Sequence, residues 1–129
     1  MKIVADTNIF LAVVLNAPEK EWIIRITEGH NLAAPDVLPF EIGNALTAMM
    51  RKRILNADNL TKVWDIVQKI PVELRSIDIR ASIEKASRLN IYAYDAYFIE
   101  CALNLRSPLI TLDQRLKKIA GNEGISILE

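Results

Sequence analysis

Four acidic residues of this chain stand in stretches of sequence that are otherwise largely apolar: Asp6, Glu41, Asp95 and Asp113. Asp6 separates Ile3-Val4-Ala5 from a second apolar run that begins at Ile9. The other three lie in PDVLPFEIGNALTAMM, IYAYDAYFIECAL and LITLDQRLKK. Burying a carboxylate without a partner costs free energy, so these positions indicate a bound cation, a structural hydrogen bond or chemistry.

Each of these carboxylates also has an ordinary structural explanation. Asp6 and Asp95 could satisfy a helix N-terminus, where the helix dipole favours negative charge. Asp113 has the residue type of a good N-cap. Glu41 could be a partly exposed helix acid or the partner of a lysine elsewhere. The remaining acidic residues lie mostly beside lysine, arginine or polar residues, which is typical of surface charge.

The elements that would position the four acids alternate between strands and helices. Short apolar runs predict strands at residues 3–5, 32–34, 72–77, 109–111 and 125–128. Apolar periodicity and stop signals predict helices at residues 8–15, 19–28, 36–55, 57–70, 79–89, 93–105 and 113–120. The predicted N-caps include Thr7 or Asn8, Asp36 and Asp78.

This alternation predicts an α/β fold with a parallel sheet covered by helices on both faces. In such sheets, ligands bind at the carboxyl ends of the strands. Asp6 comes one residue after a predicted strand, and Asp113 comes two residues after the strand that ends at Thr111. Residues i and i+2 of an extended segment point the same way, so Thr111 and Asp113 could face one pocket.

Four converging carboxylates would repel one another unless a cation neutralised them. Mg²⁺ and Mn²⁺ prefer oxygen ligands and often take only one or two carboxylates together with water. Such ions polarise a phosphoryl oxygen and lower the pKa of a bound water. The predicted chemistry is therefore hydrolysis of a phosphodiester.

Composition limits the other classes of function. The 129 residues suit a single domain over residues 1–129, and lysine plus arginine (16) balances aspartate plus glutamate (16). Any nucleic-acid contact must therefore come from a local basic patch or a bound metal. The single cysteine, Cys101, cannot form an internal disulfide and is expected to be a small buried side chain. No apolar run is long enough to span a membrane, no cleaved signal peptide is expected, and we expect a cytoplasmic protein.

Two further features have competing interpretations. The basic residues Arg51, Lys52, Arg53 and Arg115 either complement helix ends and solvent or contact RNA phosphates. Trp22 and Trp64 either belong to the core or line an apolar groove, between the predicted helices 19–28 and 57–70, that receives a partner helix.

Taken together, the segments ADTNIF (5–10), PFEIGNAL (39–46), YDAYFIECA (94–102) and TLDQRL (111–116) resemble a PIN domain. They are most similar to the small ribonucleases that act as toxins in VapBC toxin–antitoxin pairs. The resemblance implies a three-layer α/β/α sandwich around a short parallel sheet. It also implies a homodimer and a small VapB-type antitoxin that covers the active site.

The resemblance further assigns roles to individual residues. Asp6, Glu41, Asp95 and Asp113 would form the acidic quartet that binds Mg²⁺ or Mn²⁺, with the first three holding the main ion. Thr7, Asn8 and Thr111 would support the pocket. The implied reaction is metal-assisted attack of water on RNA, which leaves 5′-phosphate ends.

Three alternatives remain open. The first is an RNA-maturation nuclease of the same family that has no antitoxin. The second is a receiver-like phosphoacceptor module, which normally has paired acids after its first strand and a late lysine after a strand; this chain has neither feature. The third is a non-catalytic binding module with a degenerate site, against which the presence of all four acids argues.

Overall fold

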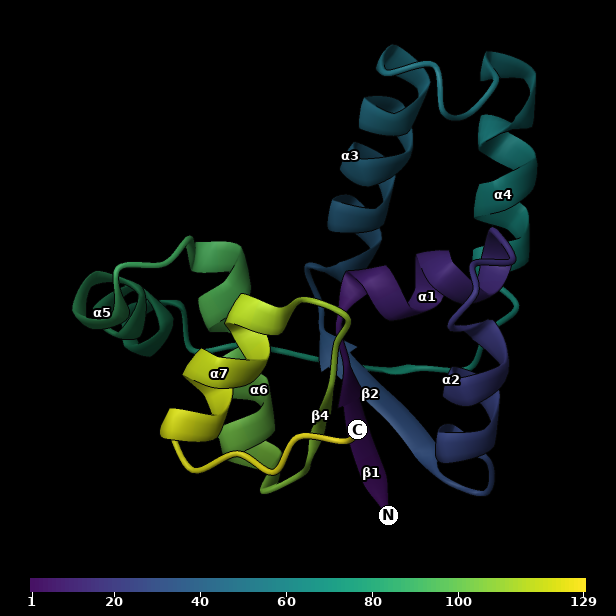
Figure 1. Ribbon diagram of the computed structural model, residues 1–129. Helices are drawn as coiled ribbons and strands as arrows, with labels where there is room; N and C mark the ends of the chain where they lie inside the picture. The colour runs from purple at the N-terminus through teal and green to yellow at the C-terminus, as the bar shows by residue number, and fades with distance from the viewer.

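A four-stranded parallel sheet forms the centre of the computed structural model, which describes all 129 residues (Figure 1). Its strands are β1 (Lys2–Ala5), β2 (Asn31–Pro35), β3 (Glu73–Arg75) and β4 (Leu109–Ile110), in the spatial order β3-β2-β1-β4. The first residue pairs are Lys2 with Asn31, Val4 with Leu109, and Ala33 with Glu73. Each connection between parallel strands must cross over the sheet, and helices make these crossovers here.

Helices cover both faces of the sheet (Figure 1). One side carries α1 (Thr7–Val14), α2 (Lys20–Thr27), α3 (Leu38–Arg51), the short 3₁₀ turn η1 (Ala57–Asn59) and α4 (Leu60–Val67). The other side carries α5 (Ile79–Leu89), α6 (Ala93–Leu105) and α7 (Gln114–Asn122). The predicted three-layer α/β/α fold is confirmed.

The core explains why the central part of β1 and all of β4 are apolar, whereas β3 (ELR) is exposed and largely charged. Ile3, Val4 and Ala5 of β1 are fully buried, as are Leu109 and Ile110 of β4. A strand in the middle of a parallel sheet has helices on both faces, so neither face needs polar residues. Cys101 is 1 % exposed within this core, which confirms its prediction as a buried side chain.

The predicted helix starts were partly wrong. The N-cap of α1 is Asp6, not Thr7 or Asn8. Asp36 does not cap α3: the N-cap residue is Val37, and no side chain accepts a hydrogen bond at this end of the helix. The backbone N–H of Asp36 donates to the carbonyl of Arg75 (2.8 Å) and extends the β2–β3 pairing. The helix begins only at Leu38. Asp78 is confirmed as the N-cap of α5, where its side chain accepts from the backbone N–H of Ala81 (3.0 Å).

Several predicted ends also differ from the structure. The helix predicted to reach residue 55 ends at Arg51, and Arg53 is left-handed (φ 60°). The helix predicted at 57–70 is η1 followed by α4, which ends at Val67. Residues 125–128 do not form a strand: Ile127 makes one isolated bridge to Leu109. Two residues of β4 are too short a template for a longer ladder.

The structure has an apolar cavity in a different place from the groove predicted between α2 and α4. Trp22 and Trp64 are half-buried and pack against the core. This cavity, about 680 Å³, lies between α3, the start of α5 and α6, where Phe40, Ile79 and Tyr94 line it. No helix is long and apolar enough to cross a membrane.

Candidate active site

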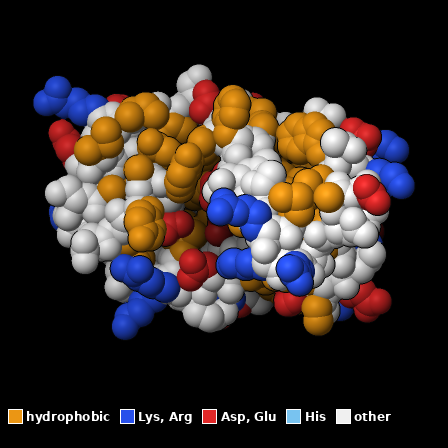
Figure 2. All heavy atoms as spheres, turned by 90° about the horizontal axis from the view of Figure 1, so that it is seen from above, with side chains coloured by type: hydrophobic (Ala, Val, Ile, Leu, Met, Phe, Trp, Pro, Cys, Tyr) orange, Lys and Arg blue, Asp and Glu red, His pale blue; other side chains and the backbone are white.

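The four predicted acids gather at the carboxyl ends of the strands. The spatial order β3-β2-β1-β4 reverses direction at β1, because β2 and β4 lie on opposite sides of it. Asp6 follows β1, and its backbone N–H donates to the carbonyl of Ile110 at the end of β4 (3.0 Å). Ligands of open α/β sheets bind at such a switch point. From above, Figure 2 shows acidic side chains in a central hollow, with basic side chains near its edges.

Asp6 is the most deeply buried of the four, with only 6 % of its surface exposed. Its Oδ1 accepts from the backbone N–H of Thr7 (2.8 Å), and its Oδ2 accepts from the hydroxyl of Thr111 (2.7 Å). Burial raises the pKa of this carboxyl, these two hydrogen bonds oppose the rise, and the charges of Asp95 and Asp113 add to it. Asp6 therefore belongs to the acidic cluster and is also the N-cap of α1.

Asn8 and Thr111 connect the ends of β1 and β4. The Asn8 amide donates to Asp6 Oδ2 (3.2 Å) and to Thr111 Oγ1 (3.3 Å). Its carbonyl oxygen accepts from the backbone N–H of Leu112 (3.1 Å). Thr111 is fully buried, and its hydroxyl also accepts from the backbone N–H of Asp113 (3.1 Å). Two segments, residues 6–8 and 111–113, are thus fixed relative to one another by two short polar side chains.

Asp113 lies at the exposed edge of the cluster. Its Oδ1 accepts from the backbone N–H groups of Arg115 (2.9 Å) and Leu116 (3.2 Å). Asp113 is therefore the N-cap of α7, which was the structural alternative for this residue. Its charge also raises the pKa of Asp6 and of Asp95. Asp113 can thus cap the helix and belong to the acidic cluster at the same time.

Asp95 is half-buried in the first turn of α6. Desolvation raises the pKa of its carboxyl, the charge of Asp113 raises it further, and the positive charge of Arg115 lowers it. The aromatic neighbours in this helix, Tyr94 and Tyr97, form an edge-to-face pair at a centroid distance of 5.9 Å.

Glu41 is half-buried on α3. Burial raises the pKa of its carboxyl to about 7, the charges of Asp6 and Asp95 contribute to the rise, and the neighbouring Thr7 hydroxyl opposes it. Even so, Glu41 Oε2 and Thr7 Oγ1 are both buried without a hydrogen-bond partner. Buried oxygens without partners are rare in folded proteins and call for a specific explanation.

No basic side chain forms an ion pair with this cluster, although the charge of Arg115 acts on Asp95. The five ion pairs of the chain involve none of the four acids. Nor do any three Asp, Glu, His or Cys side chains converge closely enough to bind one ion by themselves. The donor set nevertheless suits a hard divalent ion: all ligands are oxygens, one buried carboxylate oxygen is free, and Mg²⁺ needs only one or two carboxylates besides water.

The predicted basic residues are divided between two places. Arg51, Lys52 and Arg53 are exposed at the end of α3, which projects beyond the carboxyl ends of the strands (Figure 1). Arg115 lies in the first turn of α7, beside the acidic cluster.

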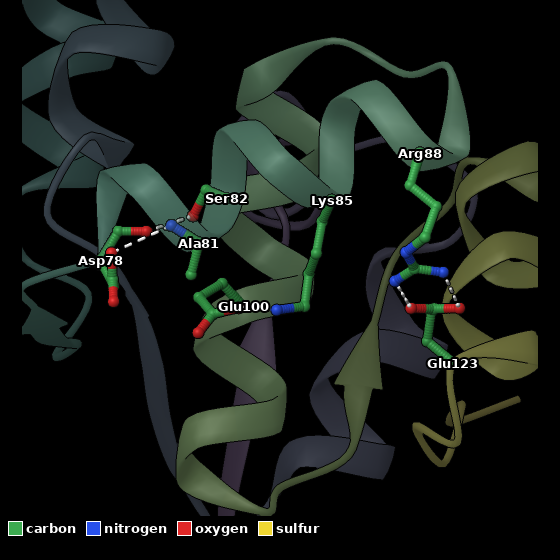
Figure 3. Close-up of polar contacts among 7 residues, drawn as sticks. All are labelled: Asp78, Ala81, Ser82, Lys85, Arg88, Glu100 and Glu123. Carbon is green, nitrogen blue, oxygen red and sulfur yellow. Dashed lines mark hydrogen bonds and ion pairs between the residues drawn. The ribbon is translucent and has the colours of Figure 1, made fainter.

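Two ion pairs that hold α5 in place were not predicted from the sequence (Figure 3). Lys85 and Glu100 pair at 2.5 Å, and Glu100 is only 7 % exposed. Arg88 pairs with Glu123 beyond the end of α7 (2.6 Å). These partners are 15 and 35 residues apart in the chain, so no local pattern could reveal them. They fix α5 against α6 and α7, and with it the loop that leads to Asp95.

The fold is a parallel α/β/α sandwich, and the carboxylates at its switch point form no ion pair. These two features are typical of a metal-dependent α/β enzyme. The family model of the PIN domain matches residues 3–122, and the chain belongs to this family. The chain is 23 % identical over 121 residues to Ribonuclease VapC3 of Pyrobaculum aerophilum, covering 90 % of this chain and 92 % of that protein. This agrees with the resemblance predicted from the four sequence segments.

Solved structures show the same fold. The crystal structure of VapBC2 from Rickettsia felis, bound to a DNA fragment from its promoter, aligns with a TM-score of 0.69 and 16 % identity, covering all of this chain (100 %) and 98 % of that chain. The crystal structure of PAE2754 from Pyrobaculum aerophilum aligns with a TM-score of 0.70 and 21 % identity, covering 92 % of this chain and 84 % of that chain.

Proposed function

We propose that this protein is a ribonuclease that cleaves RNA phosphodiesters with the help of Mg²⁺ or Mn²⁺. The observation that carries the proposal is the cluster of carboxylates at the switch point, which has no basic partner and includes a buried, unpartnered glutamate oxygen. Crowded carboxylates of this kind are stable only with a cation or with some of their protons retained. The similarity to Ribonuclease VapC3 supports RNA as the substrate.

In this proposal, Asp6, Glu41 and Asp95 would hold the main ion together with water molecules, since the three carboxylates do not converge closely enough to bind it alone, and Asp113 would act at its edge. When bound, the ion would supply Lewis-acid stabilisation of the phosphoryl oxygens and a more acidic water. Thr7, Asn8 and Thr111 support the pocket, and Thr111 and Asn8 orient the carboxylate of Asp6 through their hydrogen bonds.

The role of a toxin is part of the same proposal. One structural neighbour is the VapBC2 complex, whose name joins a VapC-type protein to a VapB-type partner. We propose a small VapB-type antitoxin as the partner of this chain, together with a homodimeric, cytoplasmic protein that consists of a single domain over residues 1–129. Arg51, Lys52 and Arg53 are proposed RNA contacts, because they are exposed and lie beyond the carboxyl ends of the strands.

A second candidate is an RNA-maturation nuclease with the same chemistry and no antitoxin. A short neighbouring reading frame that encodes a DNA-binding protein would favour the toxin, and its absence would favour RNA maturation.

The test is to map RNA ends by sequencing. Total RNA is incubated with the purified protein and Mn²⁺, next to an EDTA control and the variant Asp6→Asn. Asparagine can still cap α1, so the variant should fold while new 5′-phosphate ends fall at least about 100-fold, as expected for loss of a main metal ligand. Asp65→Asn, an exposed acid on α4, is the matched control and should cleave normally. Unchanged cleavage by Asp6→Asn, or by the wild type in EDTA, would contradict the proposal.

A further inference from the structure

A small cavity opens next to the acidic cluster, where three helices meet. It has a volume of about 330 Å³, and its lining residues are Asn90, Ile91, Tyr92 and Arg115. Asn90 ends α5 in a left-handed conformation (φ 55°), a conformation that asparagine adopts more readily than most residues. Tyr92 is the N-cap residue of α6. The cavity is therefore built on fixed helix ends and not on a long loop.

Arg115 reaches this cavity with most of its hydrogen-bonding capacity unused. Its Nη2 donates to the backbone carbonyl of Asn90 (3.2 Å), and this is the only hydrogen bond its guanidinium makes within the chain. The side chain is exposed and belongs to none of the ion pairs. Its backbone N–H donates to Asp113, and its charge acts on Asp95. A positioned guanidinium with free donors is well suited to a phosphate oxygen.

Tyr92 presents an aromatic ring at the same place. The side chain is 81 % exposed, the largest exposed fraction among the large hydrophobic residues of the chain. It makes no side-chain hydrogen bond that caps α6. Tyr92 is three residues before Asp95 in the chain, so its backbone lies about one helical turn from that of a candidate metal ligand. Exposed aromatic rings beside a positive charge are the usual means of holding a single-stranded base.

We infer that Tyr92 and Arg115 form a nucleotide subsite for single-stranded RNA next to the acidic cluster. Arg115 binds a phosphate, and Tyr92 stacks on the neighbouring base. This inference rests on the proposed ribonuclease function and adds the residues that hold the substrate. The chain has no net charge, so a backbone phosphate needs a local cation of this kind on a surface where carboxylates predominate.

The subsite can be tested by binding alone, without cleavage. In the Asp6→Asn background, fluorescence anisotropy with Mn²⁺ would measure the Kd for labelled oligoadenylate and oligouridylate RNA of about 12 nucleotides. Tyr92→Leu should weaken binding about fivefold or more, and more for oligoadenylate, whereas Tyr92→Phe should bind like the parent. Equal affinities for the leucine and phenylalanine variants would overturn the role of Tyr92.

The role of Arg115 is tested by salt. Between roughly 50 and 300 mM KCl, Arg115→Met should reduce the slope of log Kd against log salt by about 0.7, the value for one contact to a single-stranded phosphate. Arg115→Lys should keep the slope. The control, Arg80→Met, removes an exposed charge on α5 that is absent from the cavity lining and should also keep it. An unchanged slope in Arg115→Met would overturn the inference.

Melting temperatures of all variants separate misfolding from lost contacts. If Arg115→Met does not fold, the comparison of Tyr92→Leu with Tyr92→Phe decides alone. Cleavage by the wild type is measured separately. If the wild type cleaves RNA and the Tyr92 and Arg115 variants bind RNA like the parent, only the subsite is refuted. A wild type that neither cleaves nor binds RNA refutes both the subsite and the proposed function.

Discussion

Replacing Glu41 with glutamine should make the protein more stable at neutral and alkaline pH. In the folded chain, burial and the charges of Asp6 and Asp95 raise the pKa of this carboxyl from 4.5 to about 7. As pH rises between these two values, the unfolded chain releases a proton that the folded chain retains, so the free energy of unfolding falls. Glutamine does not titrate in this pH range, so the free energy of unfolding of Glu41→Gln does not fall for this reason.

The pKa difference corresponds to roughly 3 kcal/mol at most. Glu41 is only half-buried, and solvent screening lowers the effect, so we expect about 1–2 kcal/mol. Urea denaturation of both proteins in EDTA, at intervals from about pH 4.5 to pH 8, would measure it. The glutamine amide adds a constant offset, so only the change with pH is diagnostic. A difference in unfolding free energy that stays constant over this pH range would refute the reasoning. Adding Mn²⁺ at pH 8 should stabilise the wild type more than the variant.

Three other changes test the packing around the site. Thr111→Val removes the hydrogen bond to Asp6 and should cost about 2 kcal/mol in urea denaturation; a cost below about 0.5 kcal/mol would contradict the role given to the hydroxyl. Glu100→Leu leaves Lys85 without its partner and should cost about 2 kcal/mol, most of which Lys85→Met should restore in the double variant. Cys101 is 1 % exposed and its pKa is raised to about 12, so a thiol reagent should label it only in denaturant. Rapid labelling of the native protein would argue against this burial.

The sequence was sufficient to predict the acidic cluster because the fold does most of the positioning. Once short apolar runs alternate with amphipathic helices, the carboxyl ends of the parallel strands must meet along one edge. Asp6 follows β1 directly, and Asp113 comes three residues after the end of β4. Asp95 and Glu41 start their helices at the same edge, and their apolar surroundings in the sequence agree with the partial burial of both carboxyls in the structure.

Other details depended on contacts that the sequence does not encode locally. Asp36 resembles an N-cap, but its backbone N–H is used by the pairing with β3 and the helix starts later. The 125–128 run resembles a strand, but a two-residue neighbour gives it only one bridge. The pair Lys85–Glu100 joins two helices across 15 residues of sequence. In each of these examples a partner from another element decides the outcome.

The polar link between the ends of β1 and β4 has a consequence for protein synthesis. Asn8 and Thr111, which together hold Asp6 in place, are separated by 103 residues. A nascent chain that has emerged only as far as α6 already contains Asp6, Glu41 and Asp95, but lacks the threonine that orients Asp6 and the cap of α7. Whatever chemistry these carboxylates perform, the oriented form of Asp6 becomes available only after Thr111 has left the ribosome. An RNA-cleaving protein organised in this way would stay inactive beside the messenger RNA and ribosome that produce it until Thr111 and the start of α7 have emerged.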